Sequence, residues 1–377
     1  MMGSVPRILH VINDFRVGGA EALVRDLCAR LGGEGWDVSV VALQPNPTFI
    51  EDAVRGTGGV AFTAHPAEWG FYSVRHVAAL AAAMRDADLV HVHLFPAQLW
   101  AALAWRSLPH RARPKIVTTE HNTTNRRRTW WFRSADRWLY RHYRDTVVAV
   151  SPPTAAALTG WVGPGCVGDV RVIPTAIDFD RFAGAEPTPR ADLPGVPAGS
   201  PLLLSVGRLE PQKDHATLLR ALPLLPDIHA VLVGDGPLRG ELEALAQSLR
   251  VRDRAHFLGR RPDIPRLLKA ADVFVQPSRF EGWSIAILEA MASAGAPIVA
   301  SRAPGLAEAV TGRGWLFDVG DTEALAEAVR DALVDRDEAA RRIAAGREFA
   351  EQFRIEQCVE KHRALYRELL GENAPAT

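Results

Sequence analysis

The sequence predicts an α/β protein with two Rossmann-like domains, each a doubly wound parallel sheet covered by helices. Its 377 residues exceed what one hydrophobic core usually serves, so two domains of ordinary size are expected. Short apolar runs typical of buried strands alternate with helix-like segments along most of the chain. The alternation breaks once, at 174–200, and then restarts. Because parallel sheets bind ligands at the carboxyl ends of their strands, we expect the two halves to face a central cleft.

The first half opens with a strand, a glycine-containing loop and a helix. The strand is expected at 7–13 and the loop at 14–19. The spacing of Leu23, Leu27 and Leu31 then predicts an amphipathic helix over 20–31. The alternation continues with strands at 37–43, 89–93, 115–119, 146–150 and 170–173 and a helix at 73–85. We assign residues 1–180 to this N-terminal domain.

Residues 174–200 are rich in Pro, Gly, Ala and Asp without periodicity, and we interpret them as a linker. The second domain is assigned to 195–350. Its strands are expected at 201–206, 230–233, 256–258, 273–276, 297–300 and 315–317, with helices at 216–224, 238–249, 264–271, 306–310 and from 284 and 322. Residues 338–370 contain few helix-breaking residues, which predicts one long helix. We expect 351–377 to be a terminal helix that packs back on the N-terminal domain.

Composition and charge exclude several classes of protein. Apolar residues make up 47% and charged residues 23%, and the formal net charge is zero, so binding of nucleic acid or membrane through overall charge is not expected. Cys28, Cys166 and Cys358 are too few and too far apart for a disulfide framework or a paired metal site. The chain has neither a long apolar run nor a signal-peptide pattern, which predicts a cytoplasmic protein.

Two carboxylates stand out in the stretch 280–300. Glu281 follows the apolar run 273–276 in a loop, and Glu289 lies on the helix that starts near Ser284. A loop acid, a free helix N-terminus and a second acid further along the helix suit a site for anions and hydroxyl groups. Taken alone, Glu289 is equally well explained as a solvated helix residue.

Two cations follow the strand at 201–206. Arg208 and Lys213 lie five positions apart on a loop that precedes a helix. Beside free backbone N–H groups, Arg can bind phosphate oxygens bidentately and Lys supplies a point charge, so the pair suits a diphosphate. Surface cations are more often solvated, but lysine is rare in this chain and occurs only at Lys115, Lys213, Lys269 and Lys361.

The glycine signals are weaker. The dinucleotide pattern Gly-x-Gly-x-x-Gly is missing, because the first loop offers only Gly18-Gly19 and the second domain has Gly234 and Gly236 with the third glycine, Gly240, one position too far. These glycines tighten strand-to-helix turns, and a turn without a ligand explains them as well.

A basic and aromatic segment lies at 125–144. It contains Arg126, Arg127 and Arg128, followed by Trp130 and Trp131, and further Arg, Trp and Tyr. Such a segment suits a helix at an anionic lipid surface or a cleft for an anionic or lipid-linked acceptor. Packing of the aromatic face on the sheet with solvated arginines is the alternative. Binding of RNA has no other support in the chain.

Several motifs together resemble family 4 glycosyltransferases, the retaining enzymes of the GT-B fold that use nucleotide-sugar donors. The resemblance covers essentially the whole chain in the order of the family. The motifs are Gly18-Gly19-Ala20-Glu21, Thr119-Glu120-His121, Val148 to Ser151, Ile173 to Asp178, Gly207-Arg208 with Lys213, Gly234-Asp235-Gly236, and Glu281 with Glu289. At Thr175-Ala176 the chain departs from the Asn-Gly that is usual in the family.

The resemblance implies roles for these residues. Arg208 and Lys213 would bind the donor diphosphate, Glu281 the transferred sugar and Glu289 the ribose, and His121 would lie near the reacting sugar unless it is only a packed loop histidine. The remaining donor contacts implied are the glycine loops with Gly18, Gly19 and Gly236, the backbone near Arg261, and the backbone N–H groups of Trp283, Ser284 and Ile285. At Trp283 we expect the backbone to matter more than the ring.

No cofactor and no metal ion are implied, because the protein's own cations can stabilise the leaving group. Asp178 and Asp180 have the spacing of a metal-binding pair but lie in the interdomain segment. We expect a hexosyltransferase that uses a glycan, glycolipid or other cell-envelope acceptor, with a peripheral location at the inner membrane face if 125–144 meets lipid. The rival readings are a nucleotide-sugar epimerase, a phosphorylase and an inactive sugar-nucleotide-binding subunit. Base, sugar, acceptor, linkage and oligomeric state are not specified by the sequence.

Overall fold

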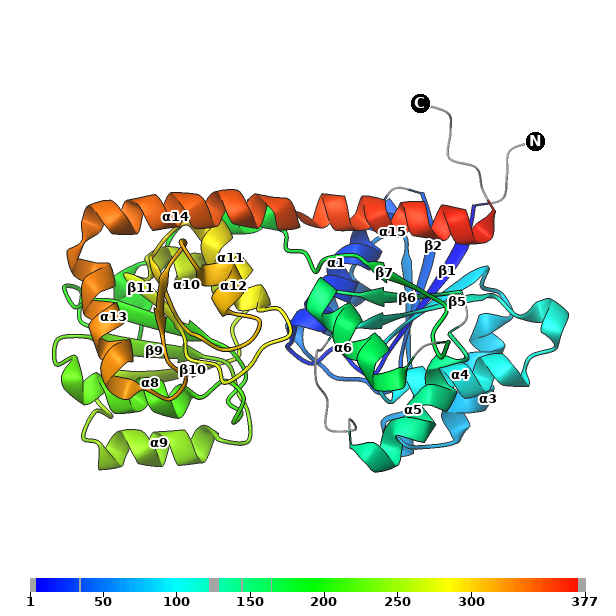
Figure 1. The fold of residues 1–377 in the computed structure, drawn as a ribbon, viewed down its shortest axis with the longest axis horizontal. Helices are drawn as coiled ribbons and strands as arrows, with labels where there is room; N and C mark the ends of the chain where they lie inside the picture. The colour runs from blue at the N-terminus through cyan, green and yellow to red at the C-terminus, as the bar shows by residue number, and fades with distance from the viewer. Residues whose placement is uncertain (1–4, 34, 122–128, 144, 164, 372–377) are drawn as a thin grey trace. The chain divides into compact units, whose positions relative to one another are not determined.

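The computed structural model describes residues 5–33, 35–121, 129–143, 145–163 and 165–371. The chain forms two compact units. Unit 1 contains residues 1–176 and 355–377, and unit 2 contains residues 177–354 (Figure 1). The two units are described separately below. Among the helices of the described ranges, none combines the length and hydropathy that a membrane span requires.

The described residues of unit 1 form a seven-stranded parallel sheet in the order β3-β2-β1-β4-β5-β6-β7. The strands are β1 (Arg7–Ile12), β2 (Asp37–Ala42), β3 (Val60–Ala64), β4 (Leu89–His93), β5 (Lys115–Glu120), β6 (Thr146–Ala149) and β7 (Asp169–Val172). The order reverses between β1 and β4, which are neighbours in the sheet but not in the chain. In doubly wound sheets this switch point is where ligands bind, beyond the carboxyl ends of the strands.

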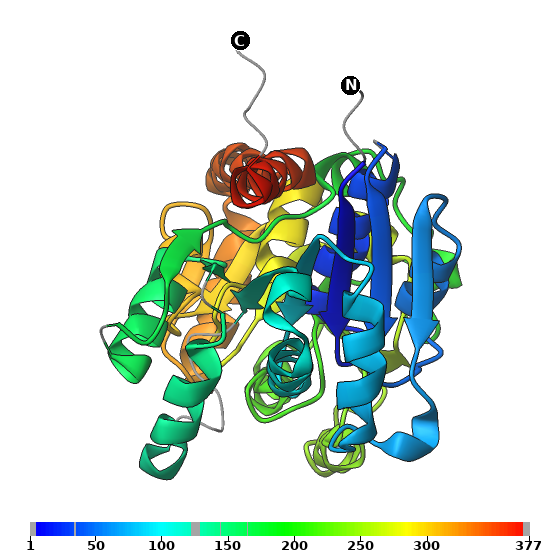
Figure 2. The same cartoon turned by 90° about the vertical axis from the view of Figure 1, so that its right-hand side faces the viewer.

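Helices cover both faces of this sheet (Figures 1 and 2). The helices of unit 1 are α1 (Gly19–Gly33), α2 (Phe49–Arg55), α3 (Arg75–Met84), α4 (Ala97–Ser107), α5 (Arg133–Tyr140), α6 (Pro152–Val162) and α15 (Ile355–Leu370), with 3-10 turns η1 (Ala67–Trp69), η2 (His110–Ala112) and η3 (Trp130–Phe132). Apolar side chains of α1, α2 and α15 pack on one face, and those of α3, α4, α5 and α6 on the other. The central strands β1, β4, β5 and β6 are buried on both faces, which explains their continuous apolar runs.

The sheet of unit 2 has six parallel strands in the order β10-β9-β8-β11-β12-β13, again counted over the described residues. Its strands are β8 (Leu202–Val206), β9 (His229–Val233), β10 (Ala255–Gly259), β11 (Val273–Gln276), β12 (Ile298–Ser301) and β13 (Trp315–Phe317). Here the switch point lies between β8 and β11. The loops that follow these two strands carry Arg208, Lys213 and Glu281, three of the charged residues that the sequence singles out.

The helices of unit 2 also form two layers. The helices are α7 (Phe179–Ala183), α8 (His215–Ala221), α9 (Arg239–Ser248), α10 (Ile264–Ala270), α11 (Ile285–Ser293), α12 (Ala307–Val310), α13 (Thr322–Val334) and α14 (Arg336–Ala350), with 3-10 turns η4 (Arg190–Asp192), η5 (Leu222–Leu224) and η6 (Glu351–Phe353). One layer contains α7, α10, α11 and α14, which pack around Phe274 and Leu288. The other layer contains α8, α9 and α13, which pack around Leu203 and Leu232.

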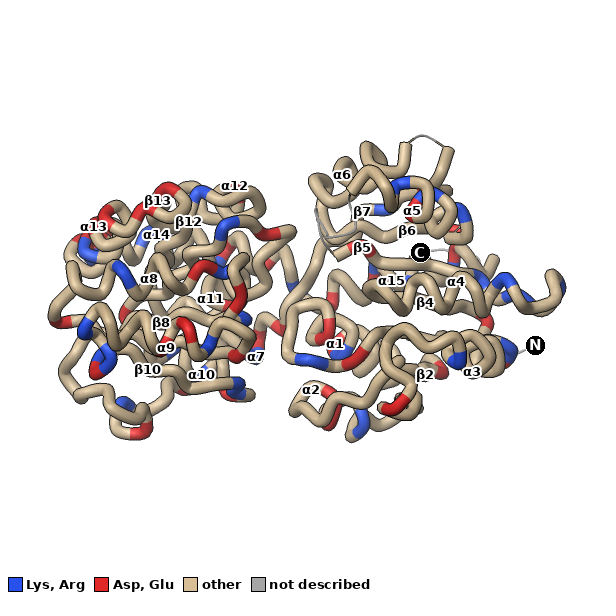
Figure 3. Tube along the Cα trace, turned by 90° about the horizontal axis from the view of Figure 1, so that it is seen from below, with Lys and Arg blue, Asp and Glu red and all other residues tan. Residues whose placement is uncertain are grey.

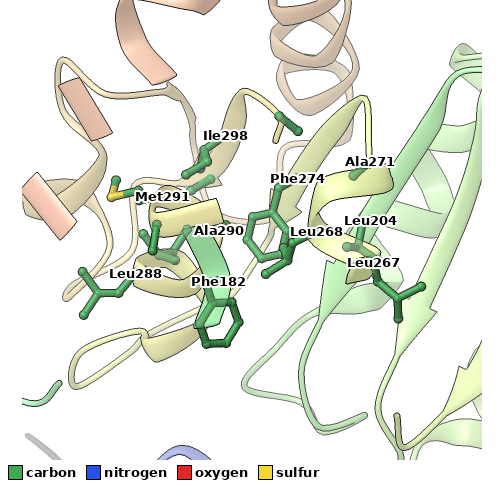
Figure 4. Packing of buried hydrophobic residues seen from close by; sticks show 14 of the residues in the cluster. Phe182, Leu204, Leu267, Leu268, Ala271, Phe274, Leu288, Ala290, Met291 and Ile298 are labelled. Carbon is green, nitrogen blue, oxygen red and sulfur yellow. The ribbon is translucent and has the colours of Figure 1, made fainter. Parts of the chain in front are cut away.

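The segment that we interpret as a linker belongs largely to unit 2. Phe179, Phe182, Leu193 and Val196 are buried in its core, and Figure 4 shows Phe182 close to Leu288 and Ala290. Boundaries at 180 and 195 are therefore misplaced relative to the observed division at 176/177. The segment lacks periodicity because it buries single aromatic and aliphatic anchors rather than one continuous face.

The long helix expected over 338–370 is interrupted. After α14 the chain passes through η6, and Arg354 has an extended backbone before α15 begins. The carbonyl of Phe353 accepts a hydrogen bond from the backbone N–H of Ile177 at 2.9 Å instead of continuing a helical ladder. The chain returns from unit 2 to unit 1 at this interruption, so α15 is part of unit 1.

Candidate functional site

The carboxyl ends of β8 and β11 bring two loops together at the switch point of unit 2. Residues 207–214 follow β8, and residues 277–284 follow β11. The backbone N–H of Arg279 donates to the carbonyl of Gln212 at 2.8 Å, and the Gln212 side chain donates to the carbonyl of Phe280 at 3.0 Å. The two loops therefore form one connected structure.

Glu281 is the centre of this structure. Its side chain is buried, and its Oε1 accepts hydrogen bonds from Lys213 Nζ at 2.6 Å and from Ser278 Oγ at 2.7 Å. Gln276 Nε2 approaches the same oxygen at 3.5 Å, and Gln212 Nε2 approaches Oε2 at 3.4 Å. A buried carboxylate must be paired and hydrogen-bonded, and this one is. The structure thus brings together Glu281 and Lys213, two of the predicted site residues.

A second ion pair supports the same junction. Asp214 is buried and adopts a left-handed backbone, and its carboxylate pairs with Arg279 at 3.3 Å and accepts from Thr217 Oγ1 at 2.9 Å. Four polar residues of this junction are not among those predicted from the sequence: Gln212, Asp214, Gln276 and Ser278. Their position at the end of β11 or in the loops after β8 and β11 is the available signal, since both strands are recognisable from their apolar runs.

The start of α11 offers an unused polar group. Ser284 occupies the N-cap position, but its side chain does not cap the helix, and within the described residues its buried hydroxyl has no hydrogen-bond partner. Buried hydroxyl groups are almost always satisfied, so this one suits a ligand that accepts or donates there. Together with the free N–H groups of a helix start, it favours an anion. Glu289 lies on the same helix and is half-buried.

A third loop, which contains Pro304 and Gly305, contacts the backbone of Glu281. The backbone N–H of Glu281 donates to the carbonyl of Pro304 at 2.9 Å, and Gly305 has a φ of +82°. A β-carbon on Gly305 would lie 2.3 Å from the carbonyl oxygen of Glu281, so only glycine fits this position. The position of Glu281 is thus fixed by three separate segments.

Two other predicted cations have partners of their own. Arg208 pairs with Glu210 on its own loop, and Arg261 pairs with Asp263 at 2.7 Å. The hydrogen bond that Arg261 donates to the Asp263 carboxylate raises the pKa of Arg261. Both arginines are partly exposed. Each guanidinium has five N–H donors, so these pairs leave part of both side chains available to a ligand.

Gly234 and Gly236 have a steric explanation. Gly234 has a φ of +138°, and a β-carbon there would lie 1.9 Å from the carbonyl oxygen of Gly207. A β-carbon on Gly236 would lie 2.5 Å from the carbonyl oxygen of Leu209. Close packing of this turn against the loop that carries Arg208 therefore requires both glycines, whatever ligand is present.

The ring of Trp283 has a structural role. Its centroid lies 5.3 Å from that of Phe353 and 6.5 Å from that of Phe349, distances typical of packed aromatic pairs. The expectation that the backbone matters more than the ring at this position does not include this contact. The ring attaches the loop before α11 to α14 and η6.

In unit 1, the predicted residues lie beyond β1 and β5. Gly18 and Gly19 precede the body of α1, and a β-carbon on Gly18 would lie 2.5 Å from Glu21 Oε2. His121 directly follows β5 and is half-buried, and desolvation lowers its pKa to about 4. At neutral pH its imidazole is uncharged. Its Nε2 lies 3.5 Å from His93 Nδ1.

The basic aromatic segment is described only from residue 129 onward, so Arg126, Arg127 and Arg128 lie outside the described residues. Trp130 and Trp131 belong to η3 and are 69% and 66% exposed. Buried Leu139 and Tyr140 attach the following helix α5 to the core. Figure 3 shows Lys and Arg positions along α5. Core packing therefore explains part of α5 but not the two exposed tryptophans.

The Asp178 and Asp180 pair has structural partners. Asp178 Oδ1 accepts from the backbone N–H of Arg181 at 3.2 Å and so caps α7, and Asp180 pairs with Arg354 at 3.0 Å. These contacts explain the two acids without a metal ion.

One group of histidines in the described ranges has metal-ligand proximity. Ring nitrogens of His10, His91 and His93 lie within 4.8 Å of one another. They already take part in hydrogen bonds: His10 with His93 at 3.1 Å, and His91 with Tyr366 at 2.6 Å and Thr119 at 2.7 Å. A hydrogen-bonded network therefore accounts for this group.

Comparison with known proteins agrees with the fold. A sequence model described as "Glycosyltransferase Family 4" matches residues 17–181, and one described as "Glycosyl transferases group 1" matches residues 193–349. The structure of Anabaena HepE in complex with UDP and glucose is similar with a TM-score of 0.83 at 22% identity, covering 96% of this chain and 99% of that one.

Curated relatives match over most of their length. A Mycobacterium tuberculosis (strain H37Rv) GDP-mannose-dependent α-(1-6)-phosphatidylinositol monomannoside mannosyltransferase is 29% identical over 367 residues, which is 91% of this chain and 93% of the relative. Glycogen synthase of the same strain is 30% identical over 373 residues, which is 88% of this chain and 86% of the relative.

The two parallel-sheet α/β units, the match to the glycosyltransferase sequence models and the similarity to the HepE structure define the class of protein. It is a glycosyltransferase of the GT-B fold. More narrowly, the chain belongs to glycosyltransferase family 4. The predictions of the fold and of a glycosyltransferase are confirmed.

Proposed function

We propose that the protein is a retaining, metal-independent hexosyltransferase that moves a sugar from a nucleotide-diphosphate donor to a lipid-linked or glycan acceptor of the cell envelope. One observation carries this proposal: at the switch point between β8 and β11, partly buried Lys213 pairs with buried Glu281, and Ser284, at the end of the same loop, has a buried hydroxyl without a hydrogen-bond partner among the described residues. This combination supplies a cation, an anion-binding helix start and an acceptor of sugar hydroxyl groups within one junction.

In this proposal the donor enters between the two loops of unit 2. Its diphosphate takes Lys213 as a partner, with Arg208 from the same loop and the first N–H groups of α11, at Trp283, Ser284 and Ile285. Glu281 then has its carboxylate available for hydroxyl groups of the sugar, and Glu289 accepts from the ribose. Gly236 and the backbone near Arg261 border the nucleotide, and Gly18 and Gly19 of unit 1 approach the diphosphate. His121 contacts the reacting sugar.

The reaction breaks the bond between the anomeric carbon and the diphosphate oxygen and forms a bond from that carbon to an acceptor hydroxyl on the same face. The proton of the acceptor hydroxyl passes to the departing phosphate. Negative charge therefore develops on the diphosphate, and Lys213 and Arg208 stabilise it with fixed positive charge. Because these cations belong to the protein, the transfer uses no metal ion.

A transfer assay tests the proposal. The protein is incubated with UDP- and GDP-linked hexoses, with and without a cell-envelope lipid and glycan extract, in EDTA. We expect release of nucleoside diphosphate that requires the extract, and a product whose anomeric configuration, measured by NMR, equals that of the donor. Glu281→Gln should reduce the rate by about 10²-fold or more, the scale of a lost transition-state contact.

Glu356 supplies the matched control for Glu281, because it is an exposed acid that pairs with Arg30 within unit 1. Glu356→Gln should leave the rate unchanged. Conversion of the donor sugar without any acceptor, inversion at the anomeric carbon, or an absolute requirement for Mg²⁺ would each contradict a part of the proposal.

The exposed tryptophans favour a lipid surface as the location of the acceptor. In flotation with vesicles, we expect the protein to rise with vesicles that contain phosphatidylglycerol and to bind less to pure phosphatidylcholine. The double variant Trp130→Ala/Trp131→Ala should reduce binding at least tenfold, since each buried indole contributes roughly 1.5–3 kcal/mol.

Tyr72→Ala is the control for this experiment, because Tyr72 is 71% exposed in unit 1 but lies outside the basic segment. Absence of flotation with both kinds of vesicle would remove the membrane role and leave a soluble acceptor as the partner of this segment.

A further inference from the structure

A row of histidines runs across neighbouring strands of unit 1 toward His121. His10 lies in β1, His93 is the last residue of β4, and His121 directly follows β5. These strands are adjacent in the sheet order. His10 and His93 are almost fully buried and half-buried His121 ends the row. Such polar groups are costly in an apolar core, so their arrangement calls for an explanation.

The row is connected by ring nitrogens. His10 Nδ1 lies 3.1 Å from His93 Nε2, and the two rings are stacked with an interplanar angle of 8°. His93 Nδ1 in turn lies 3.5 Å from His121 Nε2. Each neutral imidazole has one N–H donor and one acceptor nitrogen, so a chain of this kind has a direction.

The buried end of the chain sets the direction. Within the described residues, His10 Nε2 is buried and has no hydrogen-bond partner. An unpaired N–H donor there would lose a full hydrogen bond to water, whereas an unpaired acceptor lone pair is better tolerated. The proton of His10 therefore belongs on Nδ1, from which it is donated to His93 Nε2. His93 then carries its proton on Nδ1 and donates it to His121 Nε2.

Neighbouring histidines do not disturb this order. His91 is occupied by the hydroxyl groups of Tyr366 at 2.6 Å and Thr119 at 2.7 Å. His362 Nδ1 lies 2.9 Å from the carbonyl of Cys358, to which it can only donate. Burial lowers the pKa of His10 to about 3 and that of His121 to about 4, so the chain is neutral at pH 7.

We propose that His93 is a positioning residue that, backed by His10, holds His121 in the tautomer with the proton on Nδ1 and the lone pair of Nε2 turned to His93. His121 then presents an N–H donor and not a base. This N–H group can donate to a hydroxyl oxygen of the reacting sugar during transfer. That last role rests on the proposed function.

Tautomers are read directly from the protein without any activity. The full chain is labelled with ¹⁵N-histidine, and long-range ¹H–¹⁵N correlation spectra at pH 7.5 distinguish protonated from unprotonated ring nitrogens. The resonances of His121 are assigned by their absence in His121→Asn. We expect the Nδ1–H form in the wild-type protein. An Nε2–H form there overturns the proposal, whatever the variants do.

Two variants of His93 provide the comparison. The amide of His93→Asn can replace the Nδ1 donor, whereas the amide of His93→Gln occupies the place of Nε2. His93→Asn should keep the Nδ1–H form of His121, and His93→Gln should change it to Nε2–H or to a mixture. An unchanged His121 in a folded His93→Gln protein overturns the proposal.

The matched control comes from unit 2, where His229 Nδ1 and His256 Nε2 lie 3.0 Å apart in a similar stacked pair. His256→Gln should leave His121 unchanged. In the transfer assay, His93→Gln should lower kcat about tenfold, the scale of one lost oriented hydrogen bond, and His93→Asn should lower it less. A tautomer change without any loss of kcat would count against the role of His121 in transfer, while the tautomer assignment would stand.

Discussion

Lys213→Ala is expected to lower kcat/KM for transfer by about 10²- to 10³-fold, because it removes a fixed cation from the place where the leaving diphosphate becomes charged. It should also weaken binding of the nucleoside diphosphate product by about 1.5–3 kcal/mol, or about 10- to 150-fold, which calorimetric titration measures. Both effects have the same cause, which is the loss of the Lys213 ammonium group. This group lies 2.6 Å from Glu281 Oε1, at the junction of the two loops.

The variant also leaves Glu281 buried without its cation, which destabilises the fold. Lys213→Ala/Glu281→Gln separates the two effects: the double variant should recover stability toward urea but not activity. Lys361→Ala, an exposed lysine of α15, is the control and should behave as the wild type. Unchanged affinity in Lys213→Ala, together with lower stability, would mean that Lys213 serves only to hold Glu281.

Acid should unfold the protein well before its carboxylates are protonated. Burial lowers the pKa of His10 and His215 to about 3 and that of His362 to about 4, and it lowers the pKa of His91 and His93 well below the ordinary value. Below pH 6.5 the unfolded chain binds protons on these imidazoles and the folded chain does not. The free energy of unfolding therefore falls as the pH drops from 6.5 toward 4, and it is insensitive to these groups above 6.5.

At pH 5 the loss amounts to about 2 kcal/mol for a fully buried histidine such as His10. Several such groups together equal the stability of an ordinary domain. Urea unfolding at pH 7.5 and 5.0 measures the effect. His10→Asn should reduce the difference between the two pH values by about 2 kcal/mol, even if it lowers stability at both. Exposed His110→Asn is the control. An unchanged pH difference in His10→Asn would contradict the explanation.

The sequence is a good guide to elements that are buried on both faces. Strands such as Leu89–His93 and Val273–Gln276 were predicted with their observed bounds, because continuous apolar runs between polar turns define them. The edge strand Val60–Ala64 was missed. It is only partly buried and has a single neighbour, β2, so its composition carries little signal.

The candidate site was predictable in part. Glu281, Lys213 and Ser284 follow recognisable strands or begin a recognisable helix, so the parallel-sheet topology alone brings them to one edge. Partners such as Ser278 and Asp214 depend on how two loops far apart in the sequence meet. The same holds for the ring contact of Trp283 with Phe353, which no local pattern encodes.

Hydrogen exchange in the presence of a nucleoside diphosphate tests most directly the claim that the two loops of unit 2 form the donor site. Whichever of UDP, GDP and ADP raises the melting temperature most is added at saturation, since a ligand stabilises the state that it binds. We predict slower amide exchange in peptides that cover 207–214 and 278–288. Protection confined to unit 1, or binding of none of the three nucleotides, would contradict the account.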